Sequence, residues 1–493
     1  MAAGPGTYLG LDVGTQGVKA LLVAEDGSVV ARASRGYGLI AGLPPGAAEQ
    51  HPETWVEAAG AAARELWAKP GVSSRALAGI GVSGQQHGLV VLDETERVVR
   101  PAKLWCDTST AEEARELTRA LGRAVPTGFT ASKILWLARR EPESWARVAR
   151  VLLPHDFLNL RLSGRATMEA GDASGTGFFD PVERRFDAGA MACIDPRLES
   201  MVPPLVAAGE PSGMLTREGA ALLGLGEEAV GTPVASGGGD NMMSAIGSGA
   251  TRPGIAVVSL GTSGTVFTYS AEPLVDPAGL IAPFCDSSGG WLPLLCVMNA
   301  TGVLEEVRAA FGAEHAELER EAAAISAGAD GLLFLPFLAG ERVPDLPHAS
   351  GVLTGIRPGL FGRAHLYRAA IEGVSLNLAW GVERMRALGL AIDSVRVVGG
   401  GARNALWRSV LADALDASVV RLAEDESAAF GAALQARWTA LRLAGERISA
   451  DEVAASWVRT TGETLEPDPA RVAIYAEALE RFREWTRAAF PQA

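Results

Sequence analysis

Apolar and polar positions alternate along the first ninety-four residues in short blocks. Apolar runs of strand length, each ended by glycine or charged residues, occur at 8–14, 18–26, 28–35, 78–84 and 88–94. The Asp26-Gly27 pair between the second and third runs predicts a hairpin turn. Residues 54–69 show helical spacing, and Pro52 just ahead of them is a helix-start signal. Strands alternating with helices indicate an α/β architecture.

The pattern repeats in the second half of the chain. A G-T-x-G sequence follows an apolar strand at residues 12–18 and again at residues 259–265, and Thr15 and Thr262 lie half a chain length apart. A period this long favours a duplicated domain over a solenoid of short repeats, with chance similarity as the alternative in a glycine-rich chain. The glycine- and serine-rich stretch 232–253 is a plausible junction. We therefore predict two domains, at 1–248 and 249–493.

Composition limits the partners of this chain. A net charge of -14 and a pI near 5.1 disfavour nucleic acid and anionic membrane surfaces, which attract basic proteins. No apolar run is long enough for a membrane span, and no secretion signal is visible at the N-terminus. The four cysteines form no CxxC pair, as expected for free thiols in a reducing compartment. We expect a cytoplasmic protein with a small-molecule substrate; a homodimer is a possible assembly.

The two G-T-x-G turns suit nucleotide binding in a central cleft between the domains. Glycine lets successive backbone N–H groups converge on phosphate oxygens, and Thr15, Thr262 and Ser263 add hydroxyl donors. Asp12 at the end of its strand suits Mg²⁺, and Lys19 could supply a positive charge. A plain hairpin turn is the alternative for either sequence alone. Neither G-x-G-x-x-G nor a P-loop sequence is present, which disfavours dehydrogenases and P-loop kinases.

Two further glycine runs precede helical segments. Residues 399–401 follow an apolar strand and lead into a predicted helix at 405–415, an arrangement that can approach an anion or a nucleotide closely. Residues 237–239 lead directly into Asp240, which opens a helix of small residues. An N-cap is one interpretation of Asp240. A general base that accepts a hydroxyl proton during phosphoryl transfer is the other, and we favour it.

Several motifs together resemble the FGGY carbohydrate kinases. Residues 128–140 resemble the first family pattern through Thr130, Lys133 and Trp136, although Arg140 departs from it. Residues 351–356 and 365–372 fit the second pattern, and the resemblance covers nearly the whole chain. It implies two duplicated ribonuclease-H-like domains of the actin–hexokinase type, which close over ATP and a sugar.

The resemblance also implies a set of site residues. Gly84–Gly88 resembles the corresponding loop in the branch of the family that phosphorylates D-xylulose. Asp240 is implied as catalytic base, and Asp12 and Asp240 as the residues that face Mg²⁺. The implied sugar contacts are Gln86, His87, Trp105, Asp107, Asp240 and Asn241. The implied nucleotide contacts are Asp12, Gly14, Thr15, Gln16, Lys19, Gly261, Thr262, Ser263, Gly400, Gly401, Ala402 and Asn404.

Some alternatives stay open at this point. His87 could be an ordinary buried histidine. Cys106 and Ser109 stand where many relatives have Asn and Arg, which leaves the choice of sugar open. A kinase for ribulose, sedoheptulose or a polyol, and a non-catalytic sensor of sugar or nucleotide, are the rival functions.

Overall fold

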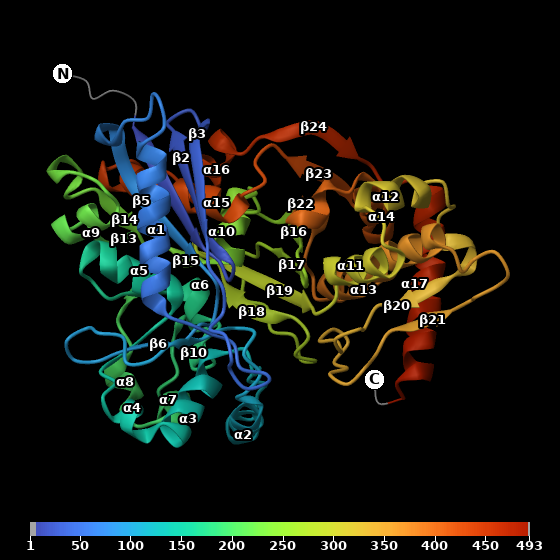
Figure 1. The fold of residues 1–493 in the computed structure, drawn as a ribbon, viewed down its shortest axis with the longest axis horizontal. Coiled ribbons are helices and arrows are strands. Elements are labelled where there is room, and N and C mark those ends of the chain that lie inside the picture. The colour runs from blue at the N-terminus through green and yellow to red at the C-terminus, as the bar shows by residue number, and fades with distance from the viewer. Residues whose placement is uncertain (1–5, 492–493) are drawn as a thin grey trace. The chain divides into compact units, whose positions relative to one another are not determined.

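The computed structural model describes residues 6–491, which form two compact units. Unit 1 contains the described residues up to Thr251 together with Pro283–Leu292 and Glu426–Val458. Unit 2 contains Arg252–Ala282, Pro293–Asp425 and the described residues from Arg459 onward. The chain therefore returns to unit 1 after unit 2 has formed most of its sheet (Figure 1). The predicted boundary between residues 248 and 249 stays a prediction.

Unit 1 is built on a mixed sheet with a parallel centre. Its strand order is β13 (Pro211–Met214), β14 (Pro233–Ala235), β5 (Leu77–Gly84), β1 (Thr7–Val13), β2 (Gly17–Ala24) and β3 (Val29–Gly36). The short β15 (Gly238–Gly239) also pairs with β5. Strands β1, β14 and β15 all run parallel to β5, so their carboxyl ends lie at the same edge of the sheet.

Unit 2 repeats this topology. The path β19 (Trp291–Val297), β17 (Gly264–Thr268), β16 (Gly254–Leu260), β22 (Ile392–Val398), β23 (Ser418–Leu422) and β24 (Thr460–Leu465) forms its sheet. In unit 1, β1 forms an antiparallel hairpin with β2 and pairs in parallel with β5, which follows a crossover. In unit 2, β16 forms an antiparallel hairpin with β17 and likewise pairs in parallel with β22. The repeated G-T-x-G sequences sit in the two hairpin turns, as a duplicated domain requires.

The remaining elements surround these sheets. The helices of unit 1 are α1 (Pro52–Trp67), α2 (Ala111–Leu121), α3 (Thr130–Arg140), α4 (Pro142–Ala146), α5 (Pro154–Ser163), α6 (Ala170–Ala173), α7 (Ala188–Ile194), α8 (Leu198–Met201), α9 (Arg217–Leu222), α10 (Asp240–Gly247), α15 (Ser427–Leu443) and α16 (Ala450–Trp457). Those of unit 2 are α11 (Thr301–Phe311), α12 (His315–Ala322), α13 (Arg363–Ala387), α14 (Ala405–Leu415) and α17 (Pro469–Ala489). The short strands are β4 (Glu49–Gln50), β6 (Val90–Leu92), β7 (Ala102–Lys103), β8 (Arg150–Leu152), β9 (Met168–Glu169), β10 (Phe179–Asp180), β11 (Arg185–Phe186), β12 (Leu205–Val206), β20 (Leu333–Leu335) and β21 (Val352–Thr354). Strand β18 (Ala282–Cys285) instead pairs with β19 at the end of the second large sheet.

Helix α15 lies directly on the central strands of unit 1. A Cβ atom added to Gly10 in β1 or Gly81 in β5 would lie 1.9 Å from a carbonyl oxygen of this helix. The same helix meets α10 just as closely, because a Cβ on Gly431 would lie 1.8 Å from the Met243 carbonyl oxygen. Only glycine permits such backbone approach. These contacts fix α10, which begins at Asp240, against the sheet.

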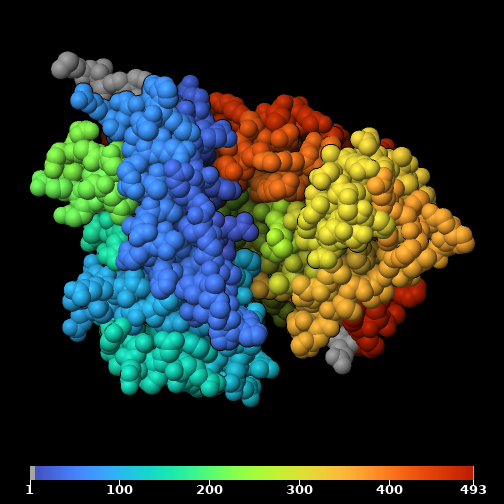
Figure 2. Space-filling view, viewed as in Figure 1, coloured from blue at the N-terminus to red at the C-terminus, as the bar shows by residue number. Residues whose placement is uncertain are grey.

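Charge pairs at the surface contribute less to the stability of the fold than this packing does. Helix α12 lies at the surface of unit 2, within the yellow region of Figure 2. Its Glu317 and Glu321 bind Arg363 at 2.7 and 2.5 Å. Exposed pairs of this kind contribute little to stability, because water and salt screen their charges. Within residues 6–491, no helix is long and apolar enough to cross a membrane.

Substituting Gly431 with alanine tests the close contact between α10 and α15. We expect Gly431→Ala to lower the melting temperature, with overpacking that costs roughly 1–3 kcal/mol, because the new methyl group meets backbone atoms. Gly38→Ala is the control, since nothing lies within 4 Å of a Cβ at that position. Differential scanning calorimetry of both variants measures the effect, and equal melting temperatures would contradict the packing described.

Candidate active site

The carboxyl edge of the unit 1 sheet gathers several predicted site residues. The register pairs Asp12 of β1 with Ser83 of β5, and Ser83 with Gly238 of β15. Asp12 therefore lies level with the residues just before Asp240. Ligands of open α/β sheets bind outside the carboxyl ends of parallel strands. The topology thus places the segments after β1, β5 and β15 where a substrate is expected.

Asp240, Asn241 and Gln86 meet at this edge. Asn241 donates its side-chain N–H to Gln86 Oε1 at 2.7 Å and to Asp240 Oδ1 at 3.2 Å, and its backbone N–H also donates to Asp240 Oδ1 at 2.8 Å. Asp240 and Asn241 are partly exposed, whereas Gln86 is buried. The predicted base thus reaches solvent while its neighbours hold its orientation.

The electrostatic surroundings of Asp240 favour a proton acceptor. Burial raises the pKa of Asp240 to about 7, and the negative charges of Asp12 and Asp172 raise it further in the same direction. A carboxyl group with a pKa near neutrality is better matched to accepting a hydroxyl proton than an ordinary aspartate. The carboxylate of Asp12 therefore helps to make Asp240 a better base.

Helix α15 anchors the glycine loop that precedes Asp240. Gln435, a fully buried residue of this helix, accepts the N–H of Gly237 at 2.8 Å and donates to the Gly237 carbonyl at 3.0 Å. Asn159 of α5 donates to the carbonyl of Ser236 at 2.8 Å. Neither amide was among the predicted site residues. No local sequence signal marks them, because each acts across a long separation in the chain.

The first G-T-x-G turn closes the β1–β2 hairpin. Gly14 donates its N–H to the Gly17 carbonyl at 3.0 Å, and Asp12 accepts the Ser83 hydroxyl at 2.8 Å. Lys19 pairs with Glu426 at 2.5 Å. Gln16 is exposed at the tip of the turn. This turn thus presents a carboxylate, a lysine and exposed backbone within a few residues.

Trp105 and Asp107 have different surroundings. Trp105 donates its indole N–H to Thr15 Oγ1 at 3.0 Å, which links a predicted sugar contact to the predicted phosphate loop. Asp107 is fully buried and accepts Lys103 Nζ at 3.1 Å and the Ser109 hydroxyl at 2.5 Å. Ser109, in the position where relatives often have Arg, therefore serves an internal hydrogen bond. The role of Asp107 as a sugar contact stays a prediction.

Two glycine-rich loops lie together in unit 2. Gly261 directly follows β16 and Gly399 directly follows its parallel neighbour β22, so both loops leave the same edge of the sheet. A Cβ on Gly401 would lie 2.7 Å from the Leu260 side chain. Thr262 is exposed, and Asn404 caps α14 by accepting the Trp407 N–H at 2.8 Å. The structure therefore brings the predicted nucleotide residues of this unit together.

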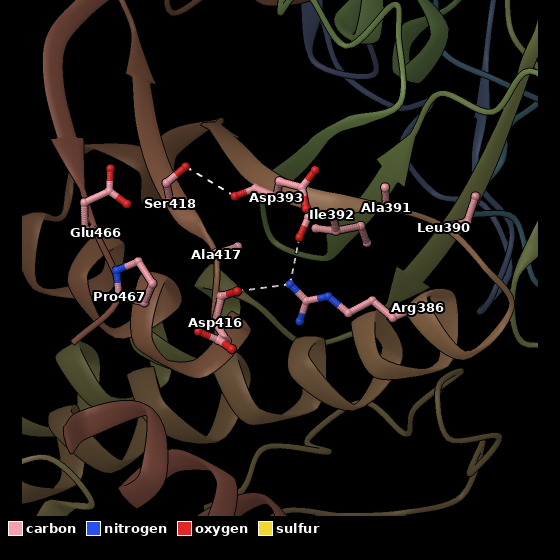
Figure 3. A pocket seen from close by; sticks show the side chains of 10 residues that line it. All are labelled: Arg386, Leu390, Ala391, Ile392, Asp393, Asp416, Ala417, Ser418, Glu466 and Pro467. Atoms are coloured by element: carbon pink, nitrogen blue, oxygen red, sulfur yellow. Dashed lines mark hydrogen bonds between the residues drawn. The ribbon is translucent and has the colours of Figure 1, made fainter. Parts of the chain in front are cut away.

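A hollow elsewhere in unit 2 contains none of the predicted residues (Figure 3). Arg386 crosses it and donates to the carbonyl oxygens of Leu415, Ile392 and Asp416 at 2.7, 2.8 and 3.2 Å. Its guanidinium is engaged with the backbone. The other charged side chains around the hollow are acidic (Asp393, Asp416 and Glu466). This lining disfavours an anionic ligand.

The carboxylates at the unit 1 edge fit a metal that is shared with a substrate. Among the described residues, no group of three or more His, Cys, Asp or Glu side chains could by itself hold a metal ion. Mg²⁺ typically takes one or two carboxylates together with substrate phosphates and water. Asp12 and Asp240 supply oxygen ligands of that kind, so the donor set matches Mg²⁺ and does not form a closed structural site.

Comparisons with known proteins match both halves of the chain to one family. The N-terminal domain pattern of the FGGY family of carbohydrate kinases matches residues 7–247, and its C-terminal domain pattern matches residues 256–440. A xylulose kinase from Haemophilus influenzae is 39% identical over 447 residues, which cover 87% of this chain and 90% of that protein. A xylulose kinase from Streptomyces coelicolor is 38% identical, with 94% of this chain and 93% of that protein covered.

A solved structure gives the same result. The crystal structure of a xyloylose kinase from Brucella ovis superposes with a TM-score of 0.91 at 34% identity, covering 99% of this chain and all of that one. The duplicated α/β fold and these matches together define a phosphotransferase that acts on a small sugar. The chain belongs to the FGGY family of carbohydrate kinases, so it is a sugar kinase that uses ATP.

The raised pKa of Asp240 predicts the pH dependence of catalysis. A base must be deprotonated to accept a proton, so kcat/KM for the sugar should fall as the pH drops through about 7. The fall should approach tenfold per pH unit below that value, since kcat/KM reports ionisations of the free enzyme. Steady-state rates from pH 5.5 to 9 measure this. Enzyme incubated at each pH and returned to pH 8 controls for denaturation, and constant kcat/KM down to pH 5.5 would contradict the prediction.

Proposed function

We propose that this kinase transfers the γ-phosphate of ATP to D-xylulose and forms D-xylulose 5-phosphate. The observation that carries the proposal is the meeting of Asp240, Asn241 and Gln86 at the carboxyl edge of unit 1, in a chain 39% identical to a xylulose kinase. These groups offer a proton acceptor and amides of both hydrogen-bonding senses. That combination suits a polyhydroxylated ligand.

The proposed reaction is a single in-line transfer. The terminal hydroxyl oxygen of the sugar forms a bond to the γ-phosphorus while the bond from that phosphorus to the β,γ-bridging oxygen breaks. ADP leaves, and the hydroxyl proton passes to the Asp240 carboxylate. Orientation of the reactants and stabilisation of charge supply most of the acceleration. The base contributes roughly 10²–10⁴-fold.

Mg²⁺ is part of the proposal through the carboxylates that would face it. When bound, it would neutralise charge on the β- and γ-phosphates. Asp12 and Asp240 are the residues we propose to hold it, directly or through water. The hydroxyl of Ser83 supports this proposal, because it donates to Asp12 Oδ1 at 2.8 Å and so fixes one carboxylate oxygen.

The other assignments follow the two units. His87, Trp105 and Asp107 remain proposed sugar contacts beside Gln86 and Asn241. The proposed nucleotide contacts of unit 1 are Asp12, Gly14, Thr15, Gln16 and Lys19. Those of unit 2 are Gly261, Thr262, Ser263, Gly400, Gly401, Ala402 and Asn404. A cytoplasmic location and a possible homodimer also belong to the proposal.

A panel of acceptors and the Asp240→Asn variant test the function together. ADP release should be fastest with D-xylulose and slower with D-ribulose, sedoheptulose and glycerol. Asp240→Asn keeps the shape but cannot accept the proton, so kcat should fall by two or more decades while KM for ATP changes only a few-fold. Faster phosphorylation of another acceptor would contradict D-xylulose as the substrate, and no turnover with any acceptor would favour a non-catalytic sensor. Near-normal turnover of Asp240→Asn would show that Asp240 is not the base.

A further inference from the structure

His87 has an unusual backbone conformation. It lies in the loop that follows β5, and its φ is 64°, in the left-handed region that residues other than glycine seldom adopt. Such a conformation is strained and persists where the surroundings enforce it. Residues of this kind often occur at ligand sites. The contacts around His87 therefore show what holds it in place.

Two side chains of α3 bind the His87 carbonyl oxygen. Lys133 Nζ donates to it at 2.7 Å and Thr130 Oγ1 at 3.2 Å. Both side chains are fully buried and belong to the first turn of the helix. Lys133 also donates to the Gly128 carbonyl at 2.6 Å, and burial lowers the pKa of this lysine to about 7. Burying an amine is costly, so the position of Lys133 between these two carbonyl oxygens needs a reason.

The His87 ring occupies a narrow slot. Its centroid lies 4.8 Å from that of Phe129 and 5.9 Å from that of Phe284. On another side, a Cβ added to Gly175 would lie 2.0 Å from ring atoms Cε1 and Nδ1. Phe129 directly precedes α3, so one wall of the slot and both carbonyl donors come from the same short segment.

We propose that Phe129, Thr130 and Lys133 form a positioning clamp that fixes the His87 imidazole and thereby sets the affinity and choice of sugar. The proposal rests on the proposed function, in which His87 contacts the sugar. Thr130 and Lys133 belong to the first family pattern, whose residues have no part in the reaction proposed above. The clamp gives Thr130 and Lys133 a role, in which they act through the His87 backbone and do not touch the substrate.

A purely structural role for α3 is the rival explanation, and matched variants separate the two. Thr130→Val keeps the shape and loses the donor, whereas Thr130→Ser keeps the donor. Lys133→Met removes both hydrogen bonds that this side chain donates, and Gly175→Ala crowds the ring without changing a residue of α3. The clamp predicts that Thr130→Val, Lys133→Met and Gly175→Ala raise KM for D-xylulose by about tenfold or change the ranking of ketoses. KM for ATP should stay within about twofold, and Thr130→Ser should resemble the parent enzyme.

A double-mutant cycle identifies His87 as the intermediary. In a His87→Ala background, Thr130→Val and Lys133→Met should add less than about twofold to the loss in kcat/KM for D-xylulose, because the ring they position is gone. If Thr130→Val and Lys133→Met lowered kcat/KM for D-xylulose by the same factor with and without His87→Ala, the clamp proposal would be wrong. It would also be wrong if the Thr130→Val and Gly175→Ala enzymes had unchanged sugar kinetics. If Lys133→Met fails to fold, the Thr130 and Gly175 variants still decide. Failure of the proposed sugar contact looks different: His87→Ala alone would then leave the kinetics of every ketose unchanged.

Discussion

The site of unit 1 depends on the approach of one helix backbone to a sheet and to a second helix. Helix α15 can touch β1 and β5 because Gly10 and Gly81 have no side chains, and it touches α10 through Gly431. Gln435 of α15 then binds both backbone groups of Gly237, just before Asp240. The proposed base is thus held by a segment nearly two hundred residues later in the chain. Any change that pushed α15 outward would move Asp240 with it.

The carboxylates at this site lower the stability of the fold and at the same time give Asp240 the raised pKa that suits a base. Asp12, Asp172 and Asp240 lie close enough for their charges to interact, and burial raises the pKa of each carboxyl group. Repulsion between neighbouring carboxylates destabilises a fold unless cations or protons offset it. His155 offsets part of it, because its ring nitrogens lie 2.8 Å from Asp172 and 2.9 Å from Asp156, and those charges raise its pKa. Asp240 has the first position of α10, where the helix dipole favours negative charge.

Much of this structure could be predicted from local sequence patterns, whereas its long-range contacts could not. The predicted helix at 405–415 is α14, and the helical spacing at 54–69 corresponds to α1, because apolar spacing and helix-start residues are local signals. The family resemblance implied that Gln86 and Asn241 both contact the sugar, and their hydrogen bond at 2.7 Å is compatible with that prediction. The return of α15 to unit 1, the Gln435 anchor and the His155 cluster were not predicted. Each depends on which distant strand or loop a buried amide or imidazole meets, and no spacing in the sequence encodes that.

A structure of the enzyme with D-xylulose and a non-hydrolysable ATP analogue would show directly whether Asp240 is the base. We expect an Asp240 carboxylate oxygen within roughly 2.6–3.2 Å of the terminal hydroxyl of the sugar. We also expect the His87 ring to lie against the sugar, with the His87 carbonyl still bound by Lys133. A sugar whose terminal hydroxyl bonded a different group, with Asp240 turned away from it, would contradict the central claim.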